Sequence, residues 1–148
     1  MTPLGVVTTI AGSGAAAWVD GIGTSASMNV PLGIVVDPTE TFLLIADASG
    51  NKIRRIEIAS GNVTTPLGSS GAGWIDAVGT ASKFSYPCGL AIDANPDGSI
   101  ARLFVADQTG NRIRVVNWTT QQVWTIGGNG TAGFALTPGG AQNQTGES

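Results

Sequence analysis

The sequence predicts an all-β fold built from repeated four-stranded antiparallel sheets. One segment occurs twice, as ADASGNKIRR at 46–55 and as ADQTGNRIRV at 106–115. In each copy an apolar run leads into a Gly-Asn turn, whose residues tolerate positive φ, and a basic–apolar strand follows. This is the pattern of a β-hairpin. No long stretch places its apolar residues at helical spacing, so almost no helix is expected.

The hairpins belong to a longer repeat. Five residues recur 56 positions later, with Gly12, Trp18, Asp20, Gly23 and Met28 matching Gly68, Trp74, Asp76, Gly79 and Phe84. The spacing is 60 between Asp47 and Asp107, because the second unit has a turn-forming insertion at 95–101, where extra residues cost little. A third unit begins at Val123.

The expected strands follow the repeat along the chain. They lie at 5–11, 31–37, 41–47, 51–58 and 61–67, and then at 88–93, 102–107, 111–118 and 121–127. Strand 31–37 is nearly all apolar, so both of its faces are expected to be buried. The Gly-rich loop at 12–30 is expected to be anchored on the sheet by Trp18 and Met28.

Four antiparallel strands followed by a long crossover describe one blade of a β-propeller. A parallel β-helix is the runner-up, but its repeats are much shorter than about 50 residues. Fewer than about three units of a repeat architecture are seldom stable alone. The chain is therefore expected to be part of a longer propeller, or to form a closed ring of copies or an open filament.

The combined motifs V-T-T-I-A-G, D-G-x-G-x-x-A, P-x-G-[IL]-x-[VI]-D and A-D-x-x-G-N-x-I-R resemble the NHL repeat over residues 6–144. The resemblance implies a propeller, commonly of six blades, with 33–36 and 89–92 along the central channel and 63–65 and 123–125 at the rim. The units expected on this basis are a rim strand of a preceding blade, two complete blades and the crossover loop of an incomplete third repeat, at 1–11, 12–67, 68–127 and 128–148.

Catalysis is not expected. The chain has no His, so it offers neither the commonest general base nor a Ser-His-Asp arrangement. Carboxylates at Asp37, Asp47, Asp93 and Asp107 suggest calcium as an alternative. A structural role is favoured, in which Asp47 and Asp107 accept hydrogen bonds from the turns of Asn51 and Asn111 or pair with Arg54 and Arg114. No catalytic residue, metal or cofactor is predicted.

Nucleic acid is an unfavoured partner, because seven basic residues face ten acidic ones and the formal net charge is −3. An RNA-binding strip of Arg54, Arg55, Arg112 and Arg114 is the alternative. No apolar run approaches the length that crosses a bilayer. The single cysteine, Cys88, is expected to be a small buried hydrophobe.

Four sequons are candidate N-glycosylation sites, at Asn62, Asn117, Asn129 and Asn143. They predict a secreted, extracellular glycoprotein, and a cytoplasmic protein is the alternative. The expected function is a non-enzymatic scaffold that associates with copies of itself or with another protein. The alternative is a two-blade portion of a larger propeller enzyme or receptor whose functional residues lie outside this chain.

Overall fold

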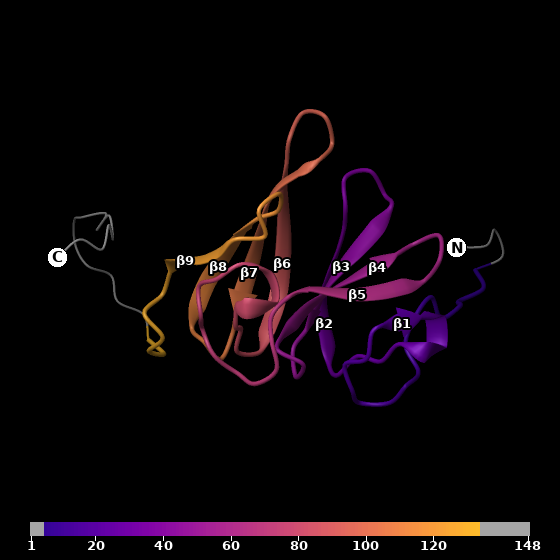
Figure 1. Cartoon of the computed structure of the whole chain (residues 1–148), viewed down its shortest axis with the longest axis horizontal. Helices are drawn as coiled ribbons and strands as arrows, with labels where there is room; N and C mark the ends of the chain where they lie inside the picture. The colour runs from indigo at the N-terminus through magenta and orange to yellow at the C-terminus, as the bar shows by residue number, and fades with distance from the viewer. Residues whose placement is uncertain (1–4, 134–148) are drawn as a thin grey trace.

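A computed structural model describes residues 5–133 of the 148-residue chain as two antiparallel sheets (Figure 1). The first blade contains β2 Pro31–Val36, β3 Phe42–Asp47, β4 Lys52–Glu57 and β5 Asn62–Leu67. The second contains β6 Pro87–Ala94, β7 Ile100–Asp107, β8 Arg112–Asn117 and β9 Val123–Gly127. The described helices are two 3-10 turns, η1 Gly23–Ser25 and η2 Gly79–Ala81. The expected all-β fold with propeller-type blades is confirmed.

Each blade is an antiparallel meander in which every strand pairs with the next one along the chain. The first sheet gains a fifth strand, β1 Gly21–Ile22, which pairs with β5 inside the segment expected to be loop. The second sheet has only a single bridge at the matching place, between Val78 and Gln122. The crossover loops thus run along the outer edge of each blade.

The prediction of a strand at 5–11 is wrong, because these residues belong to no strand of the described chain. A strand needs a neighbour to hydrogen-bond with. By the repeat, the neighbour of this segment is the third strand of a preceding blade, which is not among the described residues. The division into repeat units after residues 11, 67 and 127 stays a prediction.

The two blades pack face to face where β2 and β6 meet (Figure 1). Their shared core includes Leu44 and Ile53 of the first blade and Leu103 and Val116 of the second, all fully buried. Phe84 of the loop before β6 is buried in the same core. The core lies between the two sheets, so the other face of each sheet points away from it.

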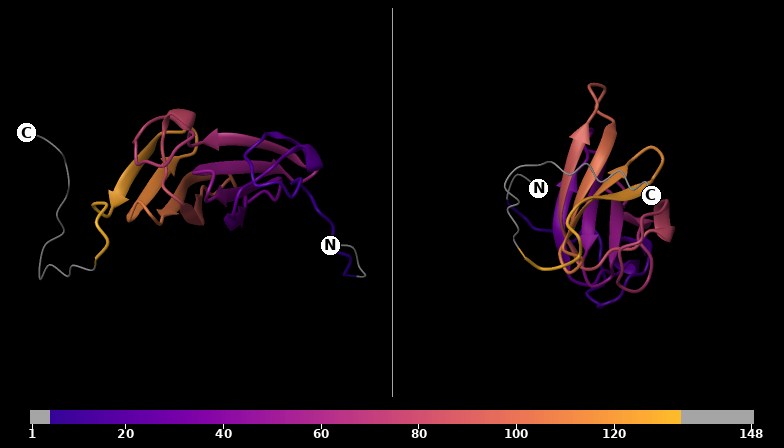
Figure 2. Two further views of the ribbon diagram at one scale, coloured as in Figure 1. Left: turned by 90° about the horizontal axis from the view of Figure 1, so that it is seen from below. Right: turned by 90° about the vertical axis from the view of Figure 1, so that its left-hand side faces the viewer.

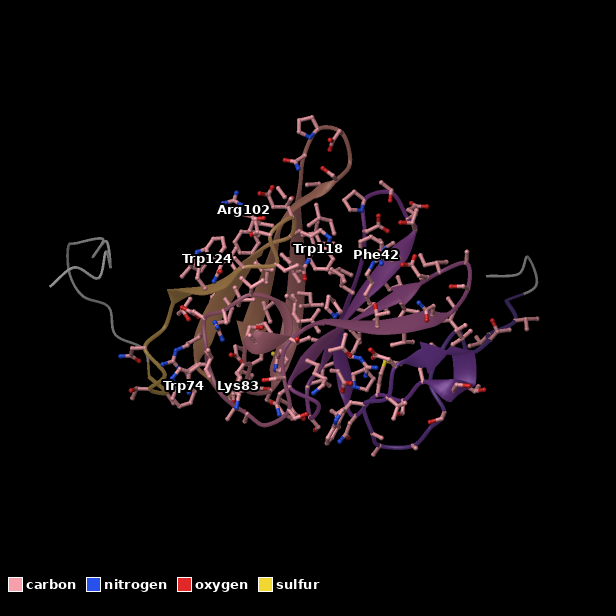
Figure 3. The ribbon with its side chains drawn as sticks, viewed as in Figure 1. Phe42, Trp74, Lys83, Arg102, Trp118 and Trp124 are labelled. Carbon is pink, nitrogen blue, oxygen red and sulfur yellow. The ribbon has the colours of Figure 1, made fainter. Side chains whose placement is uncertain are left out.

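At one end of this interface the rings of Phe42 and Trp118 stack with centroids 6.1 Å apart (Figure 3). The two sheets follow one another along the molecule, with β1 and β9 at opposite ends (Figure 2). No helix in residues 5–133 is long and apolar enough to cross a membrane.

The expected burial of β2 on both faces is wrong. Val35 packs against the shared core, but Leu32, Ile34 and Val36 are exposed by 52%, 62% and 50%. Alternate side chains of a strand point to opposite faces, and only the face turned toward the second blade is covered. Cys88 is also only half-buried, because its side of β6 lies at the open face of the second blade.

Candidate functional site

The most constrained polar group of the first blade is the fully buried guanidinium of Arg54. Its Nη1 donates to the carboxylate of Asp47 and to the carbonyl of Ser27, both at 2.9 Å. Its Nη2 donates to the carboxylate of Asp20 at 2.8 Å and to the carbonyl of Val19 at 3.0 Å. One buried cation therefore joins the β3–β4 hairpin to the crossover loop.

Arg114 repeats this arrangement in the second blade. It donates to the carboxylates of Asp107 at 3.3 Å and Asp76 at 2.6 Å. It also donates to the carbonyls of Lys83 at 2.8 Å and Ile75 at 3.1 Å. The loop that precedes each blade is thus fastened to that blade by the same buried Arg.

The sequence analysis matched Asp20 with Asp76 but did not assign them to a site, so it missed the second carboxylate of each network. The carboxylate of Asp20 accepts the backbone N–H of Thr65 at 3.2 Å, and Asp76 accepts that of Thr125 at the same distance. Their recurrence at fixed spacing, together with the recurring Arg54, was the signal that could have found them.

Each network has a buried pair, Arg54 with Asp47 and Arg114 with Asp107, and an outer carboxylate, Asp20 or Asp76, that is about half exposed. Burial raises the pKa of Asp107, although the N–H of Ser85 and the charge of Arg114 oppose the rise. The side chains of Arg54, Asp47, Arg114 and Asp107 are wholly covered. The Nε atoms of both Arg side chains have no hydrogen-bond partner in the described chain.

The turn residues Asn51 and Asn111 have φ of 56° and 47°. The side-chain oxygen of Asn51 accepts the backbone N–H of Tyr86 at 2.9 Å, which joins the two blades. The amide nitrogen of Asn111 instead donates to the carbonyls of Thr109 and Gly130 at 3.4 and 3.5 Å. Its Oδ1 accepts no hydrogen bond from the described residues.

The sequence-predicted carboxylates do not gather. Asp37 accepts the backbone N–H groups of Thr39, Thr41 and Phe42 within its own turn. Asp93 pairs with Arg102 at 2.7 Å on the surface. Among residues 5–133 no three His, Cys, Asp or Glu side chains lie together as a metal site would need.

The sequons at Asn62 and Asn117 are half-buried, and the one at Asn129 is exposed. The side-chain oxygen of Asn117 accepts from the N–H of Thr120 at 3.0 Å, and that of Asn129 from the N–H of Thr131 at 2.9 Å. Asn143 lies outside the described residues.

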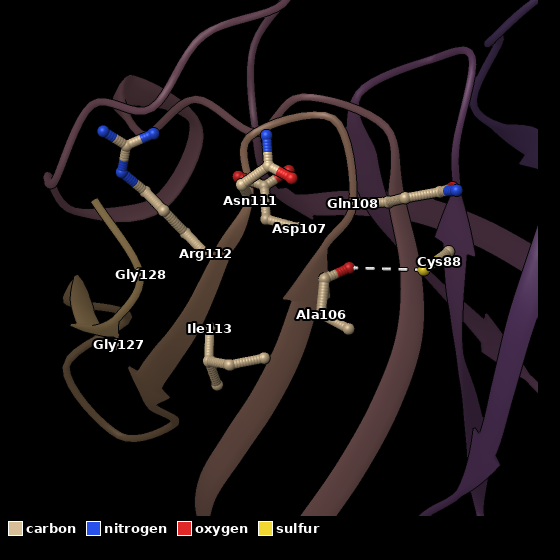
Figure 4. Close-up of a pocket in the computed structure, with 9 residues that line it drawn as sticks. All are labelled: Cys88, Ala106, Asp107, Gln108, Asn111, Arg112, Ile113, Gly127 and Gly128. Atoms are coloured by element: carbon tan, nitrogen blue, oxygen red, sulfur yellow. Dashed lines mark hydrogen bonds between the residues drawn. The ribbon is translucent and has the colours of Figure 1, made fainter. Parts of the chain in front are cut away.

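One sheet face of the second blade has no other blade of the described chain packed on it, and we call it the trailing face: Phe104, Ile113, Val115 and Trp124. On this face Ile113 is exposed, Phe104 and Trp124 are half-buried, and Val115 is buried. The exposure of this face can be compared with that of the first blade, because Ile53 and Ile113 hold matching positions in the repeat. Ile53 is fully buried and Ile113 is 45% exposed. A pocket of about 400 Å³ opens at one end of this face, lined by Cys88, Ala106, Asp107, Gln108, Asn111, Arg112, Ile113, Gly127 and Gly128 (Figure 4).

At the opposite end of the molecule lies a second apolar surface, which we call the leading face: Met28, Ile34 and Val36. Ile34 and Val36 are exposed, and Met28 packs against a buried cluster of its own blade that includes Ile45, Ile56 and Val63. Ile34 and Val36 match Leu90 and Ile92 of the second blade, which pack into the shared core. Met28 matches the fully buried Phe84 but is only half-buried. Both faces therefore leave in water the residue types that the repeat buries between blades.

The chain is similar to NHL repeat-containing protein 2 of Bos taurus and of Homo sapiens, at 35% and 32% identity over 106 residues. These matches cover 71% of this chain and 14% of each relative, so the chain spans about one seventh of the length of these curated relatives. No protein-family model matches the chain.

Three solved structures from Bacteroides share the architecture. Auxiliary nutrient binding proteins of B. ovatus and B. thetaiotaomicron match with TM-scores of 0.56 and 0.52 at 19% and 25% identity. They cover 70% and 77% of this chain and 26% of each of their own. A B. thetaiotaomicron protein provisionally named a phosphatase matches over 62% of this chain and 21% of its own, with a TM-score of 0.53 at 22% identity.

The two repeated four-stranded blades agree with these likenesses. The chain belongs to the NHL-repeat β-propeller family.

Proposed function

We propose that this chain is a non-enzymatic NHL-repeat scaffold that binds protein surfaces through its leading and trailing faces, with copies of itself or another protein as the partner. The exposure of Ile113 carries this proposal, since the matching Ile53 is buried by the neighbouring blade. Contiguous exposed apolar side chains on a soluble protein mark interaction sites. The names of the Bacteroides structures, auxiliary nutrient binding proteins, support a binding role for this architecture.

A second candidate function follows from the small share of the relatives that the chain covers. The chain matches 14% of NHL repeat-containing protein 2. The same two blades would then serve as part of a larger NHL propeller, an enzyme or a receptor, whose functional residues lie outside residues 1–148. In that case the two faces pack against further blades of the same polypeptide.

We also propose that the scaffold is extracellular and N-glycosylated. The exposed Asn129 supports this best, because a glycan needs free space around the acceptor amide. Expression through a eukaryotic secretory pathway should give a protein whose mass falls on treatment with an N-glycosidase. Asn129→Gln should remove part of that mass difference, and an unglycosylated secreted product would contradict the proposal.

The native mass of purified residues 1–148 tests the binding function. Sedimentation velocity over a concentration series should show a discrete oligomer or larger species, because association removes the two apolar faces from water. A folded monomer at every concentration would exclude self-association. Loss of association between copies when flanking blades are added to the same polypeptide would favour the larger-propeller alternative.

A further inference from the structure

The contact between the two blades is a template for what the trailing face accepts. Phe84 is buried there, close to Gly68, whose added Cβ would lie 3.2 Å from the Phe84 ring. The N–H of Tyr86 donates to Asn51. The backbones of β2 and β6 approach so closely that a Cβ on Gly33 would lie 2.5 Å from the carbonyl oxygen of Cys88.

The trailing face of the second blade repeats the surface that the first blade contributes to this contact. Its pocket is lined by Ala106, Asn111, Ile113 and Gly128, which match Ala46, Asn51, Ile53 and Gly68 around Phe84. The Oδ1 atom of Asn111 accepts no hydrogen bond from the described residues, where Asn51 accepts one from Tyr86. Gly89 holds the position of Gly33, and its added Cβ would meet only the side chain of Ala106, at 3.4 Å.

Beside the pocket, the trailing face is more apolar than the matching surface of the first blade, where Arg55 is half-buried and Thr64 is exposed. Val115 and Trp124 pair across β8 and β9 at the positions of Arg55 and Thr64. Phe104 is their neighbour on β7. Phe104 and Trp124 are half-buried and Val115 is buried, so these side chains extend the apolar surface beside the pocket.

The leading face of the first blade repeats the surface that the second blade contributes to the contact between the blades. Met28 stands at the position of Phe84, and Val30 stands at that of Tyr86 with a φ of 62° against 60°. Ile34 and Val36 stand at the positions of Leu90 and Ile92, which pack in the shared core. One chain therefore displays both complementary surfaces, and they point away from each other.

Building on the proposed self-association, we infer that the partner is a second copy of this chain, bound head to tail. The Met28 side chain of one copy, which also packs on its own blade, faces Ile113 of the other, and the N–H of its Val30 donates to Asn111. Residues 5–12 of the first copy are displaced in this contact, because Gly12 lies beside Met28 as Gly68 lies beside Phe84 and so holds the place that Gly128 of the other copy takes. The two surfaces of the contact differ, so the interface is heterologous and leaves one leading and one trailing face free on each dimer.

Two substitutions separate the faces. Ile34→Glu disables the leading face and Ile113→Glu the trailing face, and both side chains are exposed enough to be replaced without unfolding the monomer. Ile22→Glu is the matched control, because Ile22 is 63% exposed in β1, at the opposite edge of the first sheet from the β2 strand that carries Ile34 and Val36. Circular dichroism and thermal melts establish that each variant is folded.

Ile34→Glu and Ile113→Glu should each be monomeric alone at concentrations where the wild type and Ile22→Glu associate. An equimolar mixture should form a 1:1 heterodimer and nothing larger, since each variant keeps one intact face. Native mass spectrometry with one variant labelled with ¹⁵N identifies the pair, because the two variants have the same mass. No heterodimer, or wild-type association in either variant alone, would overturn the head-to-tail contact but leave self-association standing. A monomeric wild type would overturn both.

Discussion

At the scale of the residue, two Arg side chains hold the crossover loops in place. Arg54 spreads its donors over two carboxylates and two carbonyls, and Arg114 does the same one repeat later. The planar guanidinium can direct several donors at once, which a Lys ammonium cannot reproduce. The hairpin and the loop in each blade therefore depend on one buried cation.

Replacing Arg54 with Met should cost about 3–5 kcal/mol, because it leaves Asp47 buried without its charge partner. Urea unfolding of wild type and variant measures the loss in free energy of unfolding. Arg55→Met is the adjacent control, since the partly exposed pair of Arg55 with Glu57 is worth about 1 kcal/mol or less. Equal losses in the two variants would show that the buried network does not fasten the loop.

The hydrogen bonds of Asp37 predict that the free energy of unfolding depends on pH. Burial pulls its pKa up, but the N–H groups of Phe42, Thr39 and Thr41 and the Thr39 hydroxyl outweigh it and hold the pKa below its ordinary value. An acid whose pKa is lower in the folded state contributes stability above its unfolded pKa, about 3.9, and that contribution is lost as pH falls through the folded pKa.

Asp37→Asn should therefore be less stable than the wild type at pH 7 by about 1–3 kcal/mol, because a charged acceptor of three backbone N–H groups is lost. The difference should shrink as the pH falls below about 4, the pKa of an unfolded Asp. Urea unfolding at a series of pH values measures it, with Glu40→Gln in the same turn as the control. A difference that is constant with pH would contradict the assignment to Asp37.

At the scale of the element, the repeat made the hairpins predictable. Each of the eight expected strands from residue 31 onward is present within two residues of its expected ends, because apolar runs and turn residues mark both ends. β1 was missed, since a two-residue Gly-Ile pair carries no strand pattern. The expected strand at 5–11 failed because strand formation there depends on a neighbour.

The Gly-Asn turns were predicted at the right residues, but the expected positive φ is found at the Asn and not at the Gly. Asn51 takes the positive φ. Gly50 does not, but its added Cβ would lie 2.9 Å from the carboxyl carbon of Asp47. This glycine is needed for space beside a buried carboxylate, which local turn preferences could not reveal.

Substitutions at two loop glycines distinguish the cost of backbone strain from the cost of a steric clash. Gly68 and Gly71 have φ of +87° and +84°, but an added Cβ at Gly68 would lie 2.5 Å from the carbonyl oxygen of Asn51, and one at Gly71 would meet nothing within 4 Å. Gly71→Ala should cost about 1 kcal/mol and Gly68→Ala at least about 2 kcal/mol more. Thermal and urea unfolding give both values, and similar losses would mean that the loop shifts to accommodate the methyl group.

At the scale of the whole molecule, burial could not be read from local sequence. Ile53 and Ile113 lie in nearly identical segments, yet one is covered and the other is not, because coverage depends on which blade lies next to each sheet. The same limit explains the wrong expectation for β2. Repeat equivalence, applied to the structure, nevertheless identifies the kind of surface that would cover each face.

Substitutions at Gly33 and Gly89, which hold matching positions in β2 and β6, test whether the trailing face is covered as the first blade is. Gly33→Ala places a Cβ 2.5 Å from the backbone of β6, so it should push the blades apart and cost about 1–3 kcal/mol in urea unfolding. Gly89→Ala meets only Ala106 and should leave the monomer's stability nearly unchanged. It should nonetheless weaken association, because the β2 strand of a second copy would pass Gly89 as β6 passes Gly33. Sedimentation velocity measures this, and wild-type association in Gly89→Ala would mean that the trailing face is not covered by a blade of this kind.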